Sequence, residues 1–486
     1  MVLKQILSNE NLSNFENLEV EGVRQNSQEC QGGDIYFSLS KDRAKSLQRC
    51  QEALKNGASV VVSEFDCGVK ESIKVEDVRD CFAKASKQFY GNACDKMQMI
   101  AISGTNGKTS TSHIVGEILR RNGKRVGIIG TSGVFYNGKT KECPLTTPDA
   151  DFLHKTFKEM YDDGVECVVM EVSAHAIDQK RINGINFDLG VLTNITQDHL
   201  DYFKTMEEYE KTKLSFFNKK HIKKAVVCVD DERARKLLYK TNVPISTYGL
   251  EYPSDCFAVN VDCGLAGSKF VANVNDAIVN VRSSLVGDYN VYNTLAALLV
   301  CQELGLSEKQ LSDGMNCISP VEGRFNVINV DGKYAVIDFA HSPDGMFNVL
   351  KAARKMTDKK IFVVFGCGGN RDKGKRPQMG KVAEQLADYV CLTNDNPRLE
   401  SAQDIVGDIE AGMEKPHFVE LNRAKAIRKM LDFAREGDVV IIAGKGAEKY
   451  QEIGTKKYPY NDFDEVYKYC RDKKFKSLSQ EKEKLL

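Results

Sequence analysis

The stretch Ile100–Thr111 constrains the fold of this chain more than any other part of its sequence. An apolar run rich in isoleucine ends at Ser103, a turn bounded by Gly104 and Gly107 follows, and helix-compatible residues begin at Lys108. A strand, a tight turn and a helix N-terminus in this order form an anion site, because free backbone N–H groups and the helix dipole converge there. The two glycines let the backbone approach phosphate oxygens without a Cβ in the way.

The lysine and threonine that open the predicted helix suit a nucleotide. We expect Lys108 to reach the β and γ phosphates and the Thr109 hydroxyl to bind Mg²⁺. The pattern departs from G-x-x-x-x-G-K-[ST], because Ile102 stands where the first glycine belongs. A chance Gly-Lys-Thr turn is the alternative. The strand before the turn and the amphipathic run His113–Leu119 after it favour a nucleotide site.

Composition limits the size, compartment and partners of the protein. The 486 residues exceed what one hydrophobic core usually holds, so the chain should divide into two or three domains. Its 68 basic and 68 acidic residues balance, which argues against nucleic-acid binding. The lack of a long apolar run or an N-terminal signal predicts a cytoplasmic protein without membrane insertion. The 15 cysteines are scattered without a C-x-x-C pair, which predicts reduced structural thiols.

Strands and helices alternate along most of the chain, which predicts an α/β fold with three domains. Residues 1–95 should form a small α/β domain, residues 96–324 a central P-loop domain with a mostly parallel sheet, and residues 325–486 a second, independent α/β unit. Such alternation places helices on both faces of a parallel sheet and ligands at the carboxyl ends of its strands. The strands expected near the ligands are Met97–Ile102, Glu166–Val172, Asp188–Thr193, Tyr334–Phe339, Ile361–Phe365, Tyr389–Thr393 and Val439–Ala443.

Polar residues follow two of the central strands. Glu171 ends an apolar run, and Asp198 and His199 come after the next strand. A carboxylate at a strand end beside a phosphate turn usually binds Mg²⁺ or orders a water on it, so we predict that Glu171 is a metal ligand rather than a solvated acid. Taken alone, His199 reads as a capped or packed loop side chain, and Lys213 as a solvent-facing helix lysine.

The third segment places glycine, arginine and acidic residues in the loops that leave its strands. These loops contain Arg371, Arg398 and Glu448, and a helix is expected over Lys381–Ala387. Arginines and acids at one rim suit a zwitterion that bears carboxylates. The alternative is a set of ordinary loops, in which glycine and Asn-Pro are common turn residues.

The combined motifs resemble those of the Mur ligase family, in order and at family spacing. The matching segments are Gly104–Thr109, Glu171–His175, Thr193–Ile195, Asp198–Asp201, Asn290–Asn293, Glu322–Arg324, Asp338–His341, Asp395–Arg398 and Gly444–Gly446. The resemblance covers about residues 20 to 460, and the shortened glycine turn is the normal form in this family. The chain carries Ala174 and Ala447 where family members often carry serine and histidine.

The resemblance implies an ATP-dependent ligase that adds the third residue of the peptidoglycan stem peptide. Its substrates would be UDP-N-acetylmuramoyl-L-alanyl-D-glutamate and meso-diaminopimelate, because Asp395–Arg398 matches the branch that does not use lysine. ATP and Mg²⁺ would be the cofactors, and we expect a monomer. The N-terminal domain would bind the UDP-sugar, the central domain ATP, and a Rossmann-like C-terminal domain would close over ATP and the amino acid.

The resemblance also assigns residues to each ligand. The UDP-muramoyl dipeptide should be held by Ser27, Thr146, Thr147, Ser173, Gln179 and Arg181. The nucleotide should contact Gly104, Thr105, Asn106, Gly107, Lys108, Thr109, Ser110, Asn293, Arg324 and Asp338. The metals should lie among Thr109, Glu171, His199 and Lys213, with Lys213 as an N-carbamylated lysine (N6-carboxylysine). The catalytic residues would be Lys108, Glu171, His199 and Lys213. Diaminopimelate should be recognised by Arg371, Asp395, Asn396, Pro397, Arg398, Gly444 and Glu448.

The implied chemistry begins with a carboxylate, which is a poor acyl donor. ATP would phosphorylate it to an acyl phosphate, and an amine would then attack. Three alternatives stay open. They are a related ligase that uses L-lysine, an enzyme like folylpolyglutamate synthetase, and a P-loop protein that uses nucleotide only as a conformational switch.

Overall fold

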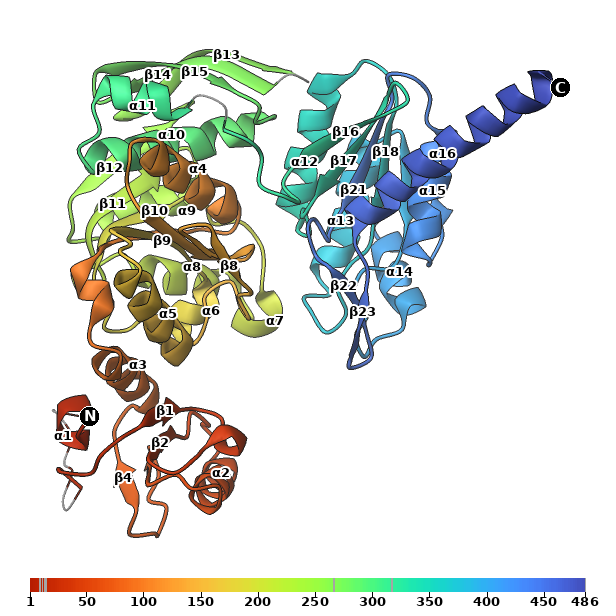
Figure 1. Cartoon of the computed structure of the whole chain (residues 1–486). Helices are drawn as coiled ribbons and strands as arrows, with labels where there is room; N and C mark the ends of the chain where they lie inside the picture. Colours follow the sequence, from red (N-terminus) through yellow and green to blue (C-terminus); the bar gives the residue numbers. More distant parts are fainter. Residues whose placement is uncertain (8–9, 11, 13–14, 265–266, 316–317, 486) are drawn as a thin grey trace.

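The computed structural model describes residues 1–7, 10, 12, 15–264, 267–315 and 318–485. Figure 1 shows three units along the chain. The N-terminal unit lies at one end of the central unit, and the C-terminal unit lies beside the central one. The predicted α/β fold with three domains is confirmed, whereas the exact domain boundaries stay a prediction.

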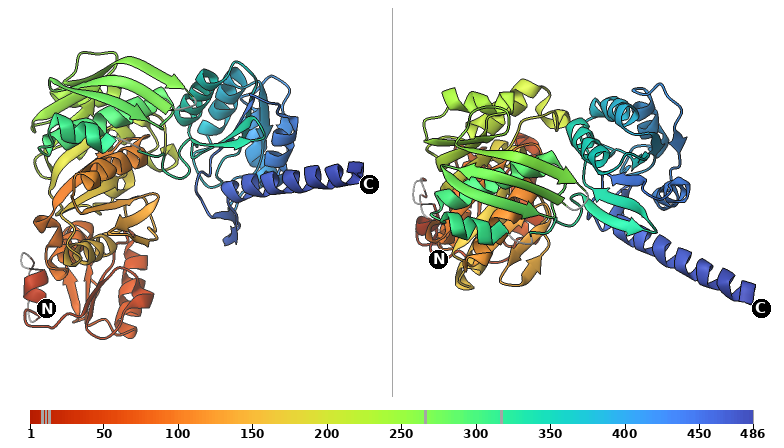
Figure 2. Two further views of the ribbon diagram at one scale, coloured as in Figure 1. Left: turned by 45° about the horizontal axis from the view of Figure 1, so that its top comes forward. Right: turned by 90° about the horizontal axis from the view of Figure 1, so that it is seen from above.

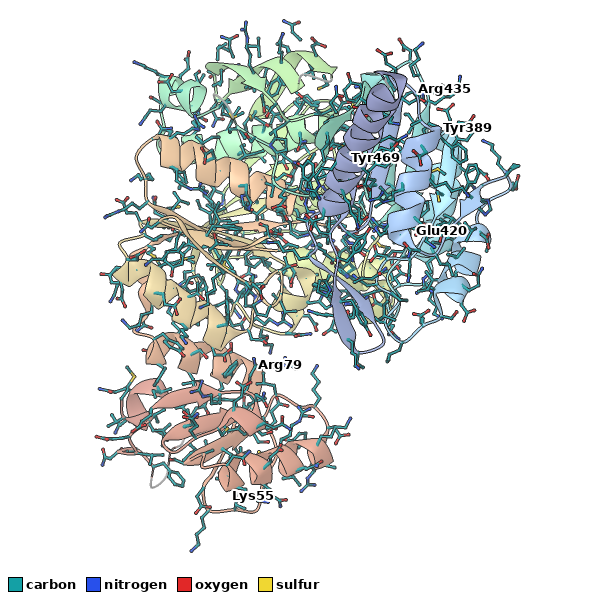
Figure 3. The ribbon with its side chains drawn as sticks, turned by 45° about the vertical axis from the view of Figure 1, so that its right-hand side comes forward. Lys55, Arg79, Tyr389, Glu420, Arg435 and Tyr469 are labelled. Atoms are coloured by element: carbon teal, nitrogen blue, oxygen red, sulfur yellow. The ribbon has the colours of Figure 1, made fainter. Side chains whose placement is uncertain are left out.

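The N-terminal unit is built on a parallel sheet whose strands run in the order β1-β2-β3-β4. Asp42 and Asp77 start its two long helices, because each side chain accepts a hydrogen bond from a free N–H of the first turn. The strands are β1 (Gly22–Arg24), β2 (Asp34–Phe37), β3 (Val60–Ser63) and β4 (Ser72–Lys74). The helices are α1 (Leu3–Ile6), η1 (Ser27–Glu29), α2 (Arg43–Lys55), α3 (Val78–Phe89) and η2 (Ala93–Lys96). In Figure 3, Arg79 on α3 lies at the side nearer the central unit, and Lys55 lies at the far side.

The central sheet runs in the order β15-β14-β13-β12-β11-β10-β5-β9-β6-β7-β8. The seven neighbouring strands β13-β12-β11-β10-β5-β9-β6 pair in parallel. The antiparallel pairs lie at the two edges, where β14 and β15 follow β13 and where β7 and β8 follow β6. The strands are β5 (Gln98–Ser103), β6 (Val126–Gly130), β7 (Gly133–Tyr136), β8 (Lys139–Lys141), β9 (Cys167–Val172), β10 (Phe187–Leu192), β11 (Ile222–Cys228), β12 (Ile245–Gly249), β13 (Cys256–Gly264), β14 (Gly267–Val274) and β15 (Ala277–Ser283). The edge meander β13–β15 was not predicted from the sequence.

Helices cover both faces of the central sheet, as expected for buried parallel strands. One core packs β5 and β9 against α4 and α10, and a second packs the opposite face against α5 and α8. The helices are α4 (Lys108–Arg121), α5 (Ala150–Asp162), α6 (Ala174–Asp178), α7 (Leu200–Phe203), α8 (Met206–Ser215), α9 (Glu232–Arg235), η3 (Lys236–Tyr239), α10 (Asp288–Glu303) and α11 (Glu308–Met315).

The C-terminal sheet runs in the order β16-β17-β21-β18-β19-β20, and only the β16–β17 pair is antiparallel. Its strands are β16 (Asn326–Val330), β17 (Lys333–Asp338), β18 (Ile361–Phe365), β19 (Tyr389–Leu392), β20 (Phe418–Val419) and β21 (Val439–Ala443), followed by the hairpin β22 (Tyr450–Ile453) and β23 (Lys456–Pro459). The helices are α12 (Pro343–Met356), α13 (Lys375–Leu386), α14 (Ala402–Glu410), α15 (Arg423–Phe433) and α16 (Asp462–Leu485).

The start of α13 corrects one prediction. The helix begins at Lys375 rather than at Lys381, so Lys375 and Arg376 belong to its first turn and not to a loop. Pro377 falls within that first turn, where its missing N–H has no intrahelical partner to lose. The correction places the Lys375 side chain at a helix N-terminus facing the central unit.

The last helix, α16, extends away from the C-terminal unit in both views of Figure 2. Its first residue is anchored by a buried ion pair, in which Arg423 Nη2 lies 2.8 Å from Asp462 Oδ2. Further along, Tyr469, which is labelled in Figure 3, donates a hydrogen bond to Asp432 at 2.8 Å. Among the described residues, no helix is long and apolar enough to cross a membrane.

Candidate active site

A cavity of about 760 Å³ lies at the carboxyl ends of the parallel strands of the central and C-terminal sheets. It brings together most of the predicted nucleotide and amino-acid residues. From the central unit and the linker it is lined by Thr105, Asn106, Gly107, Lys108, Thr109, Ser110, Thr146, Glu171, His199, Asn293 and Arg324. From the C-terminal unit it is lined by Asp338, Arg371, Asp395, Asn396, Arg398, Gly444 and Glu448.

The two glycines of the phosphate turn have the backbone geometry that only glycine adopts readily. Gly104 has φ +142° and Gly107 has φ +85°. A Cβ on Gly104 would lie 1.8 Å from Thr193 Oγ1, and one on Gly107 would lie 2.4 Å from Asn293 Oδ1. The turn therefore packs closely against Thr193 and Asn293 at these two positions, and a residue with a Cβ would clash at either one.

Lys108 is half-buried beside the turn and makes hydrogen bonds only to backbone oxygens. Its Nζ donates to the carbonyl oxygens of Gly104 at 2.9 Å and Thr105 at 2.8 Å. Burial lowers the pKa of Lys108, and the charges of Glu171 and Asp198 oppose that shift. Within the described residues, no carboxylate lies within ion-pairing distance of this ammonium group.

Glu171 is a buried carboxylate surrounded by neutral donors. Thr109 Oγ1 donates to its Oε1 at 2.9 Å, the backbone N–H of Thr131 donates to the same oxygen at 2.9 Å, and Thr131 Oγ1 donates to Oε2 at 3.1 Å. Its relative exposure is 1%, and no ion pair with it is found among the described residues. A buried carboxylate without a counter-ion fits a site that receives a cation.

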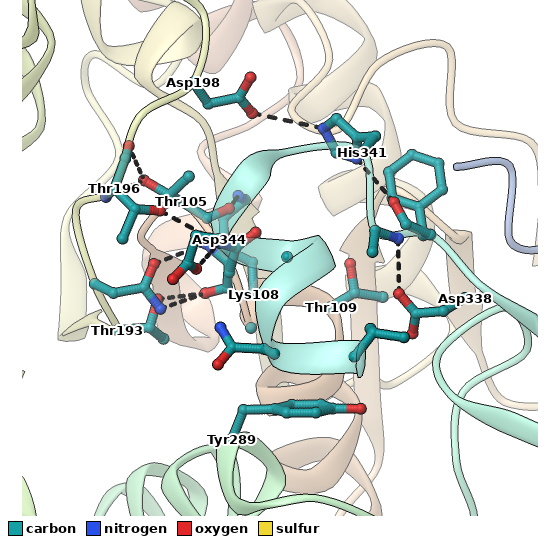
Figure 4. Close-up of a pocket in the computed structure, with 18 of the residues that line it drawn as sticks. Thr105, Lys108, Thr109, Thr193, Thr196, Asp198, Tyr289, Asp338, His341 and Asp344 are labelled. Carbon is teal, nitrogen blue, oxygen red and sulfur yellow. Dashed lines mark hydrogen bonds and ion pairs between the residues drawn. The ribbon is translucent and has the colours of Figure 1, made fainter. Parts of the chain in front are cut away.

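Asp198 links the central unit to the C-terminal unit, as Figure 4 shows for its contact with His341. Its carboxylate lies 3.5 Å from His341 Nε2, 3.4 Å from Lys375 Nζ and 3.5 Å from His199 Nε2. Burial alone would raise the pKa of Asp198, but the hydrogen bond from His341 and the charge of Lys375 hold it well below its usual range. Close by, Asn106 Nδ2 donates to Asp344 of α12 at 2.6 Å.

His199 and Lys213 both lie near the ring of Tyr209. The His199 and Tyr209 ring centroids are 6.3 Å apart, and Lys213 Nζ lies 5.0 Å from the Tyr209 ring. Burial lowers the pKa of His199 to about 3. Burial and the charge of Lys108 lower the pKa of Lys213 well below its usual range, and its Nζ donates to Gly104 O at 2.7 Å. Lys213 is thus buried near the turn rather than solvent-facing.

The residues predicted for the nucleotide beyond the turn lie around the interdomain linker. Arg324 Nη2 donates to Thr109 Oγ1 at 3.3 Å, and the guanidinium lies 4.4 Å from the Phe339 ring. Asp338 accepts hydrogen bonds from the backbone N–H groups of Phe325 at 2.8 Å and Ala340 at 2.7 Å. Burial raises the pKa of Asp338, and the charge of Arg324 opposes the shift.

The predicted amino-acid residues lie on the three loops that follow β18, β19 and β21 of the C-terminal unit. Arg398 adopts a left-handed conformation with φ +52°, and its Nε lies 2.8 Å from Glu452 Oε2. Asn396 Nδ2 donates to Glu448 Oε2 at 2.9 Å. Burial raises the pKa of Asp395. Arg371 is exposed at the cavity rim.

The predicted UDP-dipeptide residues form a separate network next to Glu171. Thr147 Oγ1 donates to Glu171 O at 2.9 Å and accepts from the Ser173 N–H at 2.9 Å. Arg181 donates to Thr147 O at 2.8 Å and to Gln179 Oε1 at 2.7 Å.

The structure does not bring Ser27 to this network. Ser27 is buried in η1, where its hydroxyl donates to Glu52 at 2.5 Å. Gln25 makes the connection instead, because its Nε2 donates at 2.8 Å to Asp149, which lies 2.9 Å from Arg181 Nε. Gln25 was not predicted from the sequence, because no motif marks it.

Three other cavity residues could have been identified from the sequence but were not predicted as site residues. Asp198 and His341 stand in the quoted motifs, and Lys375 is the first residue of α13, yet none of the three was predicted to have a role. Each belongs to the junction described above. No cluster of three or more His, Cys, Asp or Glu side chains able to hold a metal is found in the described part of the chain.

Comparisons with known proteins agree with this geometry. The Mur ligase middle domain matches residues 102–301, and the Mur ligase glutamate ligase domain matches residues 323–446. The UDP-N-acetylmuramoyl-L-alanyl-D-glutamate–2,6-diaminopimelate ligase of Bacillus velezensis is 37% identical over 93% of this chain and 94% of its own. A solved structure of a ligase with that name is 31% identical, with a TM-score of 0.72, covering 97% of this chain and 99% of the other. A MurF ligase from Thermotoga maritima in complex with ADP shares the fold at 22% identity, with a TM-score of 0.62, covering 88% and 94%.

A phosphate turn that shares one cavity with loops rich in charged residues fits an ATP-dependent ligase, the class to which the matching relatives belong. The similarity extends through all three units, at 37% identity over 93% of this chain for the relative from Bacillus velezensis. This chain belongs to the Mur ligase family.

Proposed function

We propose that this ligase adds meso-2,6-diaminopimelate to UDP-N-acetylmuramoyl-L-alanyl-D-glutamate, with ATP, in the synthesis of peptidoglycan precursors. The observation that carries the proposal is the single cavity that the phosphate turn shares with the Asp395–Arg398 loop. The relatives that match nearly the whole chain are named for this reaction. Because the reaction consumes ATP, we place it in the cytoplasm, with residues 1–95, 96–324 and 325–486 as the UDP-sugar, ATP and amino-acid domains.

The turn residues Gly104 to Ser110 would hold the ATP phosphates, with Asn293, Arg324 and Asp338 around the rest of the nucleotide. Lys108 would exchange its bonds to backbone oxygens for bonds to the β and γ phosphates. This exchange is favourable because a phosphate supplies the negative charge that the buried ammonium lacks.

The donor set around Glu171 fits Mg²⁺, which prefers oxygen ligands. Thr109 Oγ1 and Glu171 Oε1 already lie 2.9 Å apart, and Glu171 has no ion-pair partner among the described side chains. These two residues would hold one ion, and His199 with a carbamylated Lys213 would hold a second. The metal would neutralise charge on the transferring phosphoryl group.

Lys213 has the properties that carbamylation needs. Only a neutral amine attacks CO₂, and burial keeps the pKa of Lys213 far below its usual range. Carbamylation replaces a cation with a carboxylate-like group, which can then bind a metal. No carboxylate within the described residues pairs with the lysine, so the modification has no existing ion pair to break.

The two substrates would bind on opposite sides of the reaction centre. One set of side chains would hold the UDP-dipeptide and the other would hold diaminopimelate. Thr146, Thr147, Ser173, Gln179 and Arg181 would hold the part of the UDP-muramoyl dipeptide next to Glu171, and Ser27 would contact the part that reaches the N-terminal unit. The diaminopimelate would contact Arg371, Asp395, Asn396, Pro397, Arg398, Gly444 and Glu448. A guanidinium such as that of Arg398 binds a carboxylate through two parallel hydrogen bonds. L-Lysine lacks the far carboxylate of diaminopimelate, so it could not form these two bonds.

The reaction would proceed through an acyl phosphate on the side-chain carboxylate of the D-glutamate residue. Both reactants of the first step are anions, so Lys108 and the N–H groups of the turn must offset their repulsion. The amine of diaminopimelate then attacks the acyl carbon and phosphate leaves. The junction of Asp198 with His341 and Lys375 would hold the two units together and exclude water from the intermediate.

A phosphate-release assay tests the proposal. Purified protein with ATP, Mg²⁺ and the UDP-dipeptide should release phosphate on addition of meso-diaminopimelate, and mass spectrometry should detect the UDP-tripeptide. Equal turnover with L-lysine would favour the lysine ligase. Glutamate-dependent activity on a folate would favour the folylpolyglutamate synthetase alternative. Slow hydrolysis that ignores every amino acid would favour a nucleotide switch.

A further inference from the structure

Lys445 is a buried lysine beside the loops proposed to bind the amino acid. The proposed mechanism gives this lysine no role. It stands between Gly444 and Gly446, in the turn after β21, and its side chain has no exposed surface. A buried ammonium is unfavourable unless carboxylate or carbonyl groups satisfy it. Lys445 is not one of the described residues that line the cavity, so its effect on a ligand must pass through its partners.

Two of its partners belong to the proposed amino-acid site. Lys445 Nζ lies 2.7 Å from Glu448 Oε2 and donates to Asn396 Oδ1 at 2.9 Å. Asn396 Nδ2 completes the triangle by donating to the same Glu448 oxygen at 2.9 Å. Asp395 Oδ1 lies farther away, at 4.0 Å. A single buried cation thus contacts two of the side chains that line the cavity on this side, Asn396 and Glu448.

The contacts fix how both side chains are turned. An ammonium group can only donate, so the oxygen of the Asn396 amide must face it, and the backbone N–H of Glu452 donates to that oxygen too, at 2.9 Å. The amide NH₂ is then directed at Glu448. Both hydrogen bonds that Glu448 accepts from these described side chains end on Oε2, so Oε1 remains for a ligand in the cavity.

We propose that Lys445 is a positioning residue for the amino-acid substrate, holding Asn396 and Glu448 so that Glu448 Oε1 accepts from a substrate ammonium group. The inference rests on the proposed function. Of the two amines of diaminopimelate, one must be neutral to attack and the other stays protonated. Glu448 would bind the protonated amine, and the fixed geometry would favour a substrate that carries a second ammonium group at that distance.

The charge around Lys445 explains why its loss should affect the amino acid above all. Burial raises the pKa of Asp395, and the charge of Lys445 opposes that shift while the charge of Glu448 adds to it. Without the ammonium, the neighbouring carboxylates of Asp395 and Glu448 would have one cation fewer between them. Glu448 would then turn away from Asp395, and its alignment with the substrate would be lost.

Kinetics on full-length variants test the inference. Lys445→Met keeps the length of the side chain and removes its charge, and Lys445→Arg keeps the charge. Lys449→Met is the matched control, because that lysine is exposed four residues further along. We expect Lys445→Met to raise the KM for meso-diaminopimelate about tenfold or more, with the KM values for ATP and the UDP-dipeptide within about twofold of wild type. The KM for meso-diaminopimelate of Lys445→Arg should lie between those of wild type and Lys445→Met. The KM of Lys449→Met should match that of wild type.

A double variant separates positioning from general stability. If Lys445 acts through Glu448, adding Lys445→Met to Glu448→Gln should not raise the KM for diaminopimelate further. Removing both charges also avoids a lone buried carboxylate, so the double variant serves even where Lys445→Met fails to fold. An unchanged KM in Lys445→Met, equal rises in all three KM values, or full additivity in the double variant would overturn the inference. A wild-type protein inactive with diaminopimelate would instead overturn the proposed function.

Discussion

The two sides of the cavity differ in whether their charged side chains form ion pairs. On the nucleotide side, Lys108 and Lys213 donate only to backbone oxygens, and Glu171 accepts only from neutral groups, so none has an ion-pair partner among the described residues. On the amino-acid side, charges are paired within the protein. Lys445 lies 2.7 Å from Glu448, and Arg398 lies 2.8 Å from Glu452.

The difference matches the charges of the proposed ligands. A nucleotide with its metal brings several charges of both signs, which can replace the weak interactions of the unpaired groups. Diaminopimelate at neutral pH has no net charge, because its two ammonium groups balance its two carboxylates. A site that is neutral overall, with its charges held at fixed positions, suits such a ligand. Changes on the nucleotide side should therefore stop the chemistry, and changes on the other side should alter amino-acid affinity.

The largest effect should come from Lys213. We expect Lys213→Ala to lower kcat by about 10³-fold or more, because it removes the group proposed to bind the second metal. The fold should persist, since the shortened side chain buries no new charge. Steady-state phosphate release measures kcat, and thermal unfolding checks the fold. Normal activity in this variant would remove Lys213 from the nucleotide side of the comparison.

Carbamylation itself has a separate test in wild-type protein. Protonation of an amine blocks its reaction with CO₂, so the modification and the activity should both fall as the pH falls through the lowered pKa of Lys213. Protein stripped of CO₂ at acidic pH and returned to neutral buffer should regain activity on addition of bicarbonate. Intact-mass measurement should detect one CO₂ per chain before stripping. Activity that ignores CO₂ would contradict the carbamate.

Glu171→Gln should give the next largest effect. The amide keeps the size and one oxygen of the side chain but loses the charge that would attract Mg²⁺. We expect kcat to fall by about 10²-fold and the Mg²⁺ concentration at half activity to rise, with the KM for diaminopimelate unchanged. A Mg²⁺ titration at saturating ATP measures this. An unchanged Mg²⁺ requirement would show that Glu171 is only a structural acid at a strand end.

Arg398→Ala tests the paired side of the cavity. We expect kcat/KM for meso-diaminopimelate to fall by about 10²-fold or more, because the far carboxylate of the substrate loses its bidentate partner in a desolvated site. The KM values for ATP and the UDP-dipeptide should change little. Arg371→Ala is an informative comparison, since Arg371 is more exposed and should have a smaller effect. A wild-type enzyme equally active with L-lysine would contradict this assignment.

The sequence alone predicted the nucleotide side better than the amino-acid side, for a physical reason. The turn depends on backbone geometry, and Gly104, Gly107 and Lys108 mark that geometry over a few consecutive residues. Alternating apolar runs likewise predicted the parallel strands, because burial on both faces leaves a strong local signal. The family resemblance supplied the remaining site residues, whose roles stay proposals.

The features that were missed depend on contacts between distant segments. Gln25 and Asp149 meet across 124 residues, and Asp198 meets Lys375 across 177. No local pattern marks such pairs. The early start of α13 was missed because a proline suggests a break, although in the first turn of a helix it costs nothing.

The smallest expected effect concerns Glu452, which pairs with Arg398 on the amino-acid side. Its carboxylate oxygen Oε2 lies 2.8 Å from Arg398 Nε, and the guanidinium also donates from Nη1 to the backbone carbonyl oxygen of Gly369, at 2.9 Å. Glu452→Gln keeps an oxygen acceptor for Nε, so Arg398 should hold its left-handed conformation. It removes a negative charge that competes with the substrate carboxylate. We therefore expect the KM for meso-diaminopimelate to fall by about two- to fivefold, and the change to shrink at high salt because both side chains are partly exposed. A KM that instead rises tenfold would mean that the charge of Glu452 orients Arg398, and that fixed geometry outweighs charge balance on this side of the cavity.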